Sequence, residues 1–242
     1  MENSELIGLS QQTALQRNLD IIAHNLANMD TTAYKVERPL FHTYLTSIRD
    51  VEGRHDNALM VNDYGMTRDM SEGALKSTDN PLDVAIQGKG YFMVRTADGE
   101  QYTRNGHFNL SSDGTLVTSD GDPVLDSNHS AITFAQDETN LKIAQDGSIS
   151  TSSGEKGKIG VVEFANEGDL QRVGGSLYST TETPTTPDTT NVQQGMLEQS
   201  NVVPIVEMTT MIDVMRAYTQ SSQMLKQSDD LNQQAINTLG KA

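Results

Sequence analysis

Residues able to support metal or nucleophilic chemistry are present, but their spacing matches none of the common catalytic sites. The histidines are His24, His42, His55, His107 and His129. None forms an H-E-x-x-H pair, in which two imidazoles on one helix face bind zinc. No Gly-x-Ser-x-Gly segment offers a nucleophilic serine. The chain has no cysteine, so it holds neither a thiol nucleophile nor a thiolate metal site.

Two short motifs invite a ligand-binding interpretation. Residues 88–90, Gly-Lys-Gly, resemble the start of a dinucleotide fingerprint, which needs a third glycine and a following helix. Phe92 and Met93 follow instead, in a sequence typical of a strand. Residues 120–122, Asp-Gly-Asp, resemble part of a calcium loop but lack the further oxygen ligands and the closing glutamate. Both motifs are predicted to be turns, with no cofactor and no metal ion.

The 33 acidic residues leave one enzymatic alternative open. Two carboxylates facing each other across a cleft can hydrolyse a glycosidic bond, and the chain would then be a secreted ligand-binding or glycan-acting β domain. The sequence defines no such pair. We therefore predict a protein without enzymatic activity and keep this alternative for comparison.

The two ends of the chain carry apolar residues at steps of three and four. Near the N-terminus the series is Leu15, Leu19, Ile22, Leu26 and Met29; near the C-terminus it is Met208, Met211, Met215, Tyr218, Ser222, Leu225, Asp229, Asn232, Ile236 and Leu239. Such spacing makes a narrow seam that packs against a partner helix. The apolar members are the predicted assembly interface, although a helical hairpin in an ordinary core would show the same pattern.

The last helix has a second stripe beside the first. Its members are Val214, Ala217, Ser221, Met224, Ser228, Leu231 and Ala235. Two stripes on one helix allow contact with more than one neighbour. Pro204 fits this helix only in its first turn, because a proline further along would remove a backbone hydrogen bond.

Composition also favours assembly. Hydrophobic content is 35%, tryptophan is absent and the net charge is −16, so part of the apolar surface is expected to be buried only between subunits. Most of the charge lies between the terminal helices, and such an acidic middle argues against a nucleic-acid partner. No apolar run approaches membrane-spanning length. The opening residues have neither a basic region nor an apolar core, so no cleavable secretory signal is expected.

The middle of the chain is predicted to be an antiparallel β-module. Asp-Gly or Asn-Gly pairs at 98–99, 105–106, 113–114, 120–121 and 146–147 separate short apolar runs, and these pairs are the strongest hairpin signals. Residues 158–164 are the last predicted strand, and the Thr- and Pro-rich residues 180–190 read as a linker. Between residues 36 and 79 no regular element is evident.

The predicted fold class is therefore α+β, in which N- and C-terminal helices pair as a coiled-coil-like unit around a central, mostly antiparallel β-module. Four regions follow from the patterns. They are an N-terminal assembly helix at 1–30, an irregular extended segment at 31–76, a β domain at 77–185, and a linker with the C-terminal assembly helix at 186–242.

Several segments together resemble one family. Residues 26–35 (LANMDTTAYK) are similar to the LANxxTxGFK signature of bacterial flagellar rod and hook proteins. Residues 80–92 and 102–108 resemble their central module, and residues 194–202 (QGMLEQSNV) resemble the segment before their C-terminal helix. The signature positions carried over are Asn28, Thr31, Lys35, Gly88, Gly90, Gly195, Ser200 and Asn201. One departure is the Ala33-Tyr34 pair, where the family usually has Gly-Phe.

This resemblance implies a structural, torque-transmitting subunit of the flagellar basal body. Its partners would be other rod proteins, copies of itself and the flagellar type III export apparatus, with no nucleic acid and no membrane span. The implied location is the periplasmic rod, reached without a cleaved signal peptide. Residues 1–10 are most similar to members of the proximal rod, and the alternative is a subunit of the distal rod or another axial subunit of the rod or hook.

Overall fold

The computed structural model describes residues 2–49, 55–135, 138, 140–187 and 191–240, with the backbone alone for residues 2–5 and 42–64. The chain forms two compact units. Unit 1 comprises Met1–Met29, Val36–Asp69 and Val202–Ala242, and unit 2 comprises Asp30–Lys35 and Met70–Asn201. The predicted pair of terminal helices and the central antiparallel β-structure are both confirmed.

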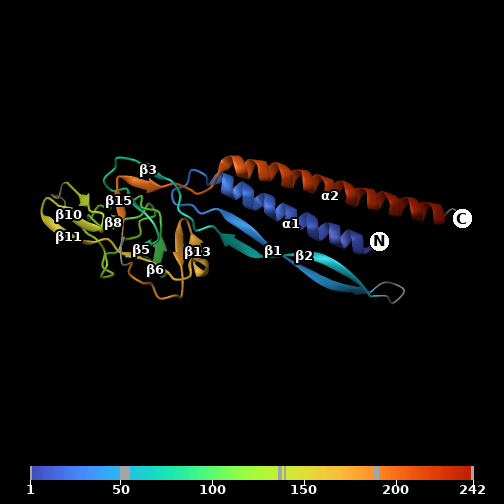
Figure 1. Cartoon of the computed structure of the whole chain (residues 1–242), viewed down its shortest axis with the longest axis horizontal. Helices are drawn as coiled ribbons and strands as arrows, with labels where there is room; N and C mark the ends of the chain where they lie inside the picture. Colours follow the sequence, from blue (N-terminus) through green and yellow to red (C-terminus); the bar gives the residue numbers. More distant parts are fainter. Residues whose placement is uncertain (1, 50–54, 136–137, 139, 188–190, 241–242) are drawn as a thin grey trace. The chain divides into compact units, whose positions relative to one another are not determined.

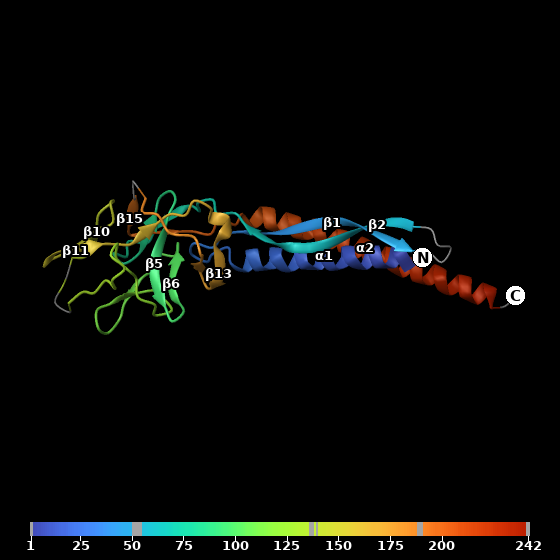
Figure 2. The same ribbon diagram turned by 90° about the horizontal axis from the view of Figure 1, so that it is seen from below.

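Unit 1 contains two long helices and a two-stranded ribbon. Its elements are α1 (Glu2–Ala27), β1 (Glu37–Arg49), β2 (His55–Arg68) and α2 (Pro204–Leu239). Within this unit α1 contacts α2 on one side and both strands of the ribbon on the other (Figures 1 and 2). The two helices run antiparallel, so the start of α1 lies toward the end of α2 (Figure 1). Pro204 is in the first turn of α2, as its missing N–H requires.

The ribbon corrects the prediction of an irregular segment at 31–76. β1 and β2 pair antiparallel from Glu37↔Arg68 to Arg49↔His55, with a register shift between Leu40 and Phe41. A two-stranded ribbon has no further strand to impose a simple alternation of apolar and polar residues, and a bulge breaks the alternation where it does occur. The sequence of the ribbon therefore lacks the pattern by which strands are usually recognised.

Unit 2, the β-module, consists of short antiparallel strands. They are β3 (Leu75–Ser77), β4 (Val84–Ile86), β5 (Tyr91–Thr96), β6 (Gly99–Thr103), β7 (Asn109–Leu110), β8 (Leu116–Val117), β9 (Lys142–Ile143), β10 (Ser148–Thr151), β11 (Gly154–Lys158), β12 (Val161–Val162), β13 (Gln171–Gly174), β14 (Leu177–Ser179), β15 (Val192–Gln194) and β16 (Met196–Glu198), with the 3-10 helix η1 (Glu167–Asp169). The largest sheet has the order β12-β5-β6-β14-β13. Along β5, Phe92 and Val94 belong to one apolar core, and Tyr91 and Met93 to a second. Both faces of this strand are thus buried.

The prediction that residues 158–164 form the last strand was wrong, because β13 to β16 follow it. These strands are short, and β15 and β16 pair with β4 and β3, which lie far away in the sequence. Such non-local pairing leaves no hairpin signal. The boundaries also differ from the prediction, since residues up to Asn201 belong to the β-module and the segment at 31–76 is divided between both units.

The predicted hairpin turns are present, with one difference. The glycines at 99, 114, 121 and 147 have positive φ, as turns between adjacent strands require. Gly106 does not have a positive φ. A glycine is needed at this position because a Cβ would lie 1.6 Å from the Val84 carbonyl oxygen and 3.1 Å from Phe92 Cε2. At the Asn105-Gly106 pair, two backbone segments therefore approach each other closely.

Replacing Gly106 by alanine should destabilise the β-module by about 1–3 kcal/mol, because a backbone carbonyl must move to admit the methyl group. Gly174→Ala is the matched control, since its Cβ would meet nothing within 4 Å. Urea unfolding of both variants measures the effect. Equal stability of the two variants would contradict the assignment of Gly106 to a packing role.

Candidate assembly interface

The seam between α1 and α2 follows a heptad pattern. The α2 side of this seam consists of the buried or half-buried residues Glu207, Met211, Val214, Tyr218, Ser221, Leu225, Ser228 and Asn232, and Ala217 beside Tyr218 is half-buried as well. The spacing of the seam residues alternates four and three, which keeps one side of a helix toward its partner. Gly8 of α1 lies against Leu225, since a Cβ on Gly8 would be 2.6 Å from Leu225 Cδ2. The absence of a side chain at Gly8 lets the two helices approach closely here.

The structure brings together only part of the predicted interface. Among the predicted positions, Ile22 is buried, and Leu15, Leu19, Leu26, Met211, Tyr218 and Leu225 are half-buried. Exposed instead are Met29, Met208, Met215, Ile236 and Leu239. The observed α2 seam takes alternate members from each predicted stripe, because the two stripes are adjacent and the sequence did not show which pairing faces α1. Ile21 and Asn25 are buried as well, and sequence reasoning missed both.

Asn25 joins both helices to the ribbon at the buried end of the seam. Its amide nitrogen donates to the Glu37 carbonyl oxygen at 2.8 Å and to Glu207 Oε2 at 3.2 Å, and its amide oxygen accepts from the Glu37 N–H at 2.9 Å. Arg68 Nε lies 3.0 Å from Glu37 Oε1. Asn25, Glu37 and Glu207 are all buried. A polar group satisfied only in this arrangement fixes the register of the helix pair.

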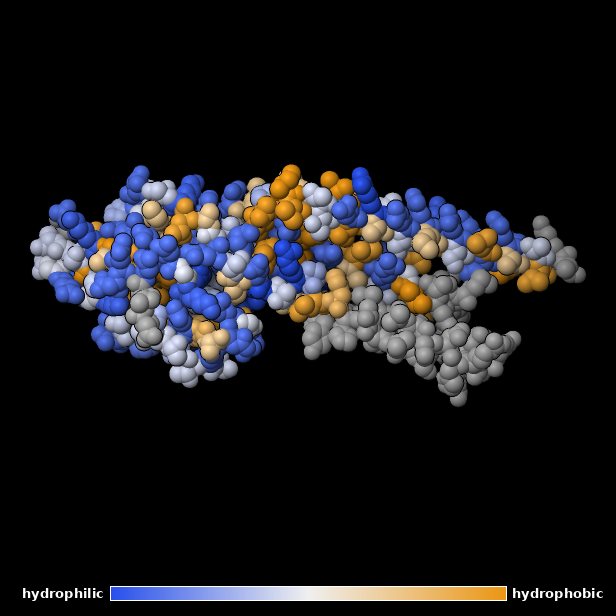
Figure 3. All heavy atoms as spheres, viewed as in Figure 1, coloured by the Kyte–Doolittle hydropathy of each residue, from blue (hydrophilic) through white to orange (hydrophobic). Residues whose placement is uncertain are grey.

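Much of the rest of α2 presents apolar side chains to solvent. The exposed large apolar residues are Val203 just before the helix and Ile205, Val206, Met208, Ile212, Met215, Met224, Leu231, Ile236 and Leu239 within it. Four of them, Ile205, Met208, Ile212 and Met215, are spaced three, four and three residues apart, and we name this set the outer stripe. Figure 3 shows apolar residues gathered over the helices, whereas hydrophilic residues cover most of the β-module. Contiguous exposed apolar surface of this kind marks an interaction site.

One of the signature positions, Lys35, contacts a buried carboxylate in the β-module, that of Glu198. Glu198 Oε1 accepts from Lys35 Nζ at 2.6 Å and from the Gly73 N–H at 2.9 Å. Glu198 Oε2 accepts from Arg104 Nη1 at 3.1 Å, and the Glu198 carbonyl oxygen accepts from the Ala33 N–H at 2.9 Å. Glu198, Lys35 and Arg104 are at most 4% exposed. We name Glu198, Lys35 and Arg104 the Glu198 cluster.

The Glu198 cluster places two cations beside one carboxylate. Burial lowers the pKa of the Lys35 amine below its usual range, and the carboxylate of Glu198 opposes that shift. Ser71 provides a further acceptor, since its carbonyl oxygen lies 2.6 Å from Lys35 Nζ. Arg104 donates to the carbonyl oxygens of Gly88 and Gly90. These contacts satisfy the buried donors, as burial of charge requires.

The remaining signature residues shape the same region of the backbone or its neighbours. Gly88, Gly90 and Gly195 have positive φ, a conformation that favours glycine. Asn201 Nδ2 donates to the Ser71 carbonyl oxygen at 3.1 Å, while Asn28 Nδ2 donates back to the His24 carbonyl oxygen at the end of α1. Ala33 also has positive φ, so an alanine adopts here a backbone conformation that favours glycine. Thr31 accepts a hydrogen bond from the Tyr34 N–H through its carbonyl oxygen.

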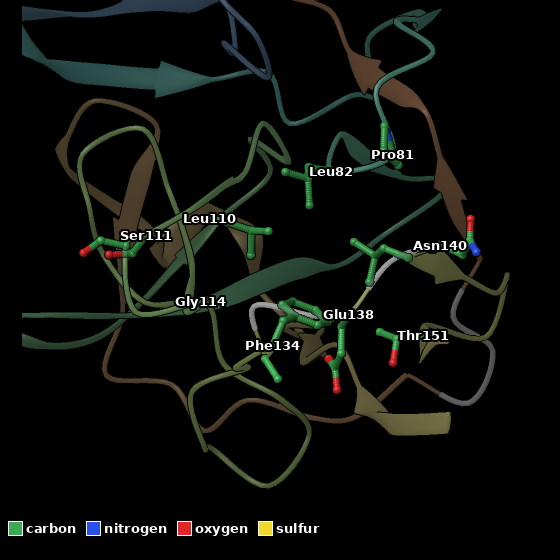
Figure 4. Close-up of a pocket in the computed structure, with 12 residues that line it drawn as sticks. Pro81, Leu82, Leu110, Ser111, Gly114, Phe134, Glu138, Asn140 and Thr151 are labelled. Atoms are coloured by element: carbon green, nitrogen blue, oxygen red, sulfur yellow. The ribbon is translucent and has the colours of Figure 1, made fainter. Parts of the chain in front are cut away.

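One cavity of the β-module lacks the pair of carboxylates that the catalytic alternative requires. This cavity of about 530 Å³ is lined by Leu82, Leu110 and Phe134 among other residues. In Figure 4 the Glu138 carboxylate points away from Leu82 and Leu110. Glu138 is the one carboxylate among the described lining residues, and Lys156 Nζ lies 2.5 Å from its Oε1. Glycoside hydrolysis needs two opposed carboxyl groups. The described part of the chain also contains no cluster of histidine and carboxylate side chains suited to a metal ion.

Among the described residues, no helix is long and apolar enough to cross a membrane.

The fold and its exposed helical surface define a structural protein with paired terminal helices and a separate β-module. Three family models match the chain. They describe the flagella basal body rod protein at residues 6–35, the flagellar hook protein FlgE/F/G D1 domain at 85–151, and the C-terminal region of the flagellar basal body rod FlgEFG proteins at 193–238.

Curated relatives match along nearly their whole length. The flagellar basal-body rod protein FlgF of Caulobacter vibrioides is 36% identical over 100% of this chain and 99% of its own. FlgF of Mesorhizobium japonicum is 33% identical, covering 99% of both chains. FlgG of Bacillus subtilis is 33% identical over 95% of this chain and 96% of its own. The chain therefore belongs to the flagellar basal-body rod protein family, and it is a structural subunit of the rod.

Proposed function

We propose that this chain is a proximal-rod subunit of the FlgF type, a non-catalytic part of the shaft that transmits torque from motor to hook. Exposed apolar residues on α2 carry the proposal, because a subunit that assembles must keep apolar surface free for its neighbours. The FlgF relatives cover both chains almost completely. A distal-rod subunit of the FlgG type is the second candidate, supported by the 33% identity to the Bacillus subtilis FlgG.

The proposed partners are other rod proteins and copies of this chain, and the predicted contacts are the exposed residues of the terminal helices. Labelling the chain in purified basal bodies and locating the label by electron microscopy tests the position. Label near the base of the rod is expected. Label next to the hook would favour the distal-rod candidate, and label absent from the rod would refute both candidates.

Changing the outer stripe should prevent assembly without unfolding the chain. Ile212 and Met215 are each at least half exposed, so the double variant Ile212→Asp/Met215→Asp should keep its circular dichroism spectrum and thermal midpoint. It should nevertheless fail to restore swimming in a strain that lacks the gene, because two charges would be buried between subunits. Gln220→Asp, at another exposed position on α2, is the control and should restore swimming.

We also propose that the flagellar type III apparatus exports the chain with its N-terminal segment intact, and that it assembles in the periplasm. The proposal is supported by the role of α1, whose residues Ile21, Ile22 and Asn25 are buried in unit 1. Removal of this segment would leave α2 without its partner. Mass spectrometry of basal-body protein should detect peptides that begin before Leu15. A mature chain starting beyond Leu15 would contradict this route.

A further inference from the structure

Methionine is concentrated on α2, and most of its methionine side chains face solvent. Four of the 11 methionines of the chain belong to this helix, and they are Met208, Met211, Met215 and Met224. Met208, Met215 and Met224 are 47%, 53% and 71% exposed, whereas Met211 on the seam is half-buried. Met93 in the core of the β-module is only 2% exposed. The thioethers of α2 are therefore open to small reagents in the free chain.

An exposed thioether is oxidised by a peroxide. The sulfur lone pair attacks one oxygen of hydrogen peroxide, an S–O bond forms and the O–O bond breaks, and the second oxygen leaves as water. The sulfur is oxidised and the peroxide is reduced, so no group leaves the protein. The product, methionine sulfoxide, is polar and disrupts interfaces that are rich in methionine.

We propose that Met208 and Met215 form a peroxide-sensitive modification site, and that their oxidation keeps the free chain out of the rod. Both belong to the outer stripe, and each is about half exposed, so their oxidation leaves the packing within unit 1 in place. The cost arises on assembly, because two polar sulfoxides would then be buried between subunits. This inference rests on the proposed rod function.

Glutamine variants imitate the polar product without any oxidant. Met208→Gln/Met215→Gln should fail to restore swimming in a strain that lacks the gene, whereas Met208→Leu/Met215→Leu should restore it. Met66→Gln is the matched control, since Met66 is 42% exposed but lies on β2 of the ribbon, and it should also restore swimming. All three variants should keep the native thermal midpoint. Normal swimming with the glutamine double variant would overturn the proposal.

A competition between two chains tests the oxidation itself. The native chain and the leucine double variant are expressed together in that strain, and hydrogen peroxide is added while rods form. Peptide mass spectrometry then measures the share of each chain in basal bodies and in the unassembled pool. Sulfoxide should accumulate at positions 208 and 215 of the unassembled native chain, with Met93 unmodified. The share of the leucine variant in basal bodies should rise with the peroxide concentration.

The outcomes separate this site from the proposed function. A share of the leucine variant that does not change with peroxide, or an unassembled native chain without sulfoxide at positions 208 and 215, would overturn the modification site while leaving the rod function intact. Absence of the native chain from basal bodies without peroxide would refute the rod function and this inference with it.

Discussion

Replacing Glu198 by glutamine is expected to lower the free energy of unfolding of the β-module by about 3–5 kcal/mol, because it leaves two buried cations without their carboxylate. Lys35 Nζ lies 2.6 Å from Glu198 Oε1, and Arg104 Nη1 lies 3.1 Å from Glu198 Oε2. The amide of glutamine would direct N–H groups toward at least one of these cations. Urea unfolding measures the change. The tyrosine signal in near-ultraviolet circular dichroism reports on this region, since Arg104 lies over the Tyr91 ring.

Two further variants make the expectation specific. Lys35→Met should cost less than Glu198→Gln, because it leaves Arg104 and Glu198 as a balanced pair. Glu100→Gln is the surface control: this carboxylate is partly exposed and pairs with Arg95 and His129, so its loss should cost no more than about 1 kcal/mol. A Glu198 variant as stable as the Glu100 variant would show that the Glu198 cluster does not stabilise the β-module.

The Glu198 cluster also explains why separate signature segments stay together. The chain crosses from one unit to the other at four places, which lie next to Asp30, Lys35, Met70 and Asn201. Glu198 accepts hydrogen bonds from Ala33 and Lys35, which belong to the segment Asp30–Lys35, and from Gly73, which lies just after Met70. Glu198 itself lies shortly before Asn201 in the sequence. The Glu198 carboxylate therefore links the segment that contains Lys35 to the segment that contains Gly73.

Replacing Leu225 by aspartate should separate α1 from α2 and abolish rod assembly. Leu225 packs against Gly8, where a side chain on α1 would collide with it, and truncating a seam leucine costs about 2–5 kcal/mol even before a charge is added. Helix content should fall at temperatures at which the β-module stays folded. Limited proteolysis should then remove the ends of the chain first, because an isolated helix is marginal in water.

Gln223→Asp is the matched control for this variant, since position 223 is exposed on the same helix. It should keep native helix content, resist proteolysis like the native chain and support swimming. Native protease resistance in the Leu225 variant would contradict the assigned seam. Loss of swimming in the Gln223 variant would show instead that any added charge on α2 disturbs assembly.

Local signals in the sequence were enough to predict the terminal helices and most turns of the β-module. Heptad spacing gave α1 and α2, and aspartate–glycine pairs gave the hairpin turns with positive φ. The ribbon of β1 and β2 was missed because it has neither a strong turn signal nor a regular alternation. The strands β15 and β16 were missed because their partners lie more than a hundred residues earlier in the chain.

The candidate interface was predicted in kind but not in detail. The sequence indicates two adjacent stripes on α2, yet the choice of stripe depends on which face α1 covers, and α1 is itself shared with the ribbon. The buried polar residues were harder to predict from the sequence than the buried apolar ones. Glu198, Arg104 and Glu207 look like ordinary surface residues in a sequence, and they become buried only when segments distant in the chain meet.

A density map of the assembled basal body at side-chain resolution tests the central claim most directly. In the isolated chain Ile205 is 70% exposed, and the other residues of the outer stripe are about half exposed. We predict that Ile205, Met208, Ile212 and Met215 are buried against neighbouring subunits in the rod. A map in which this chain occupies the rod while its outer stripe remains exposed to solvent would contradict the claim.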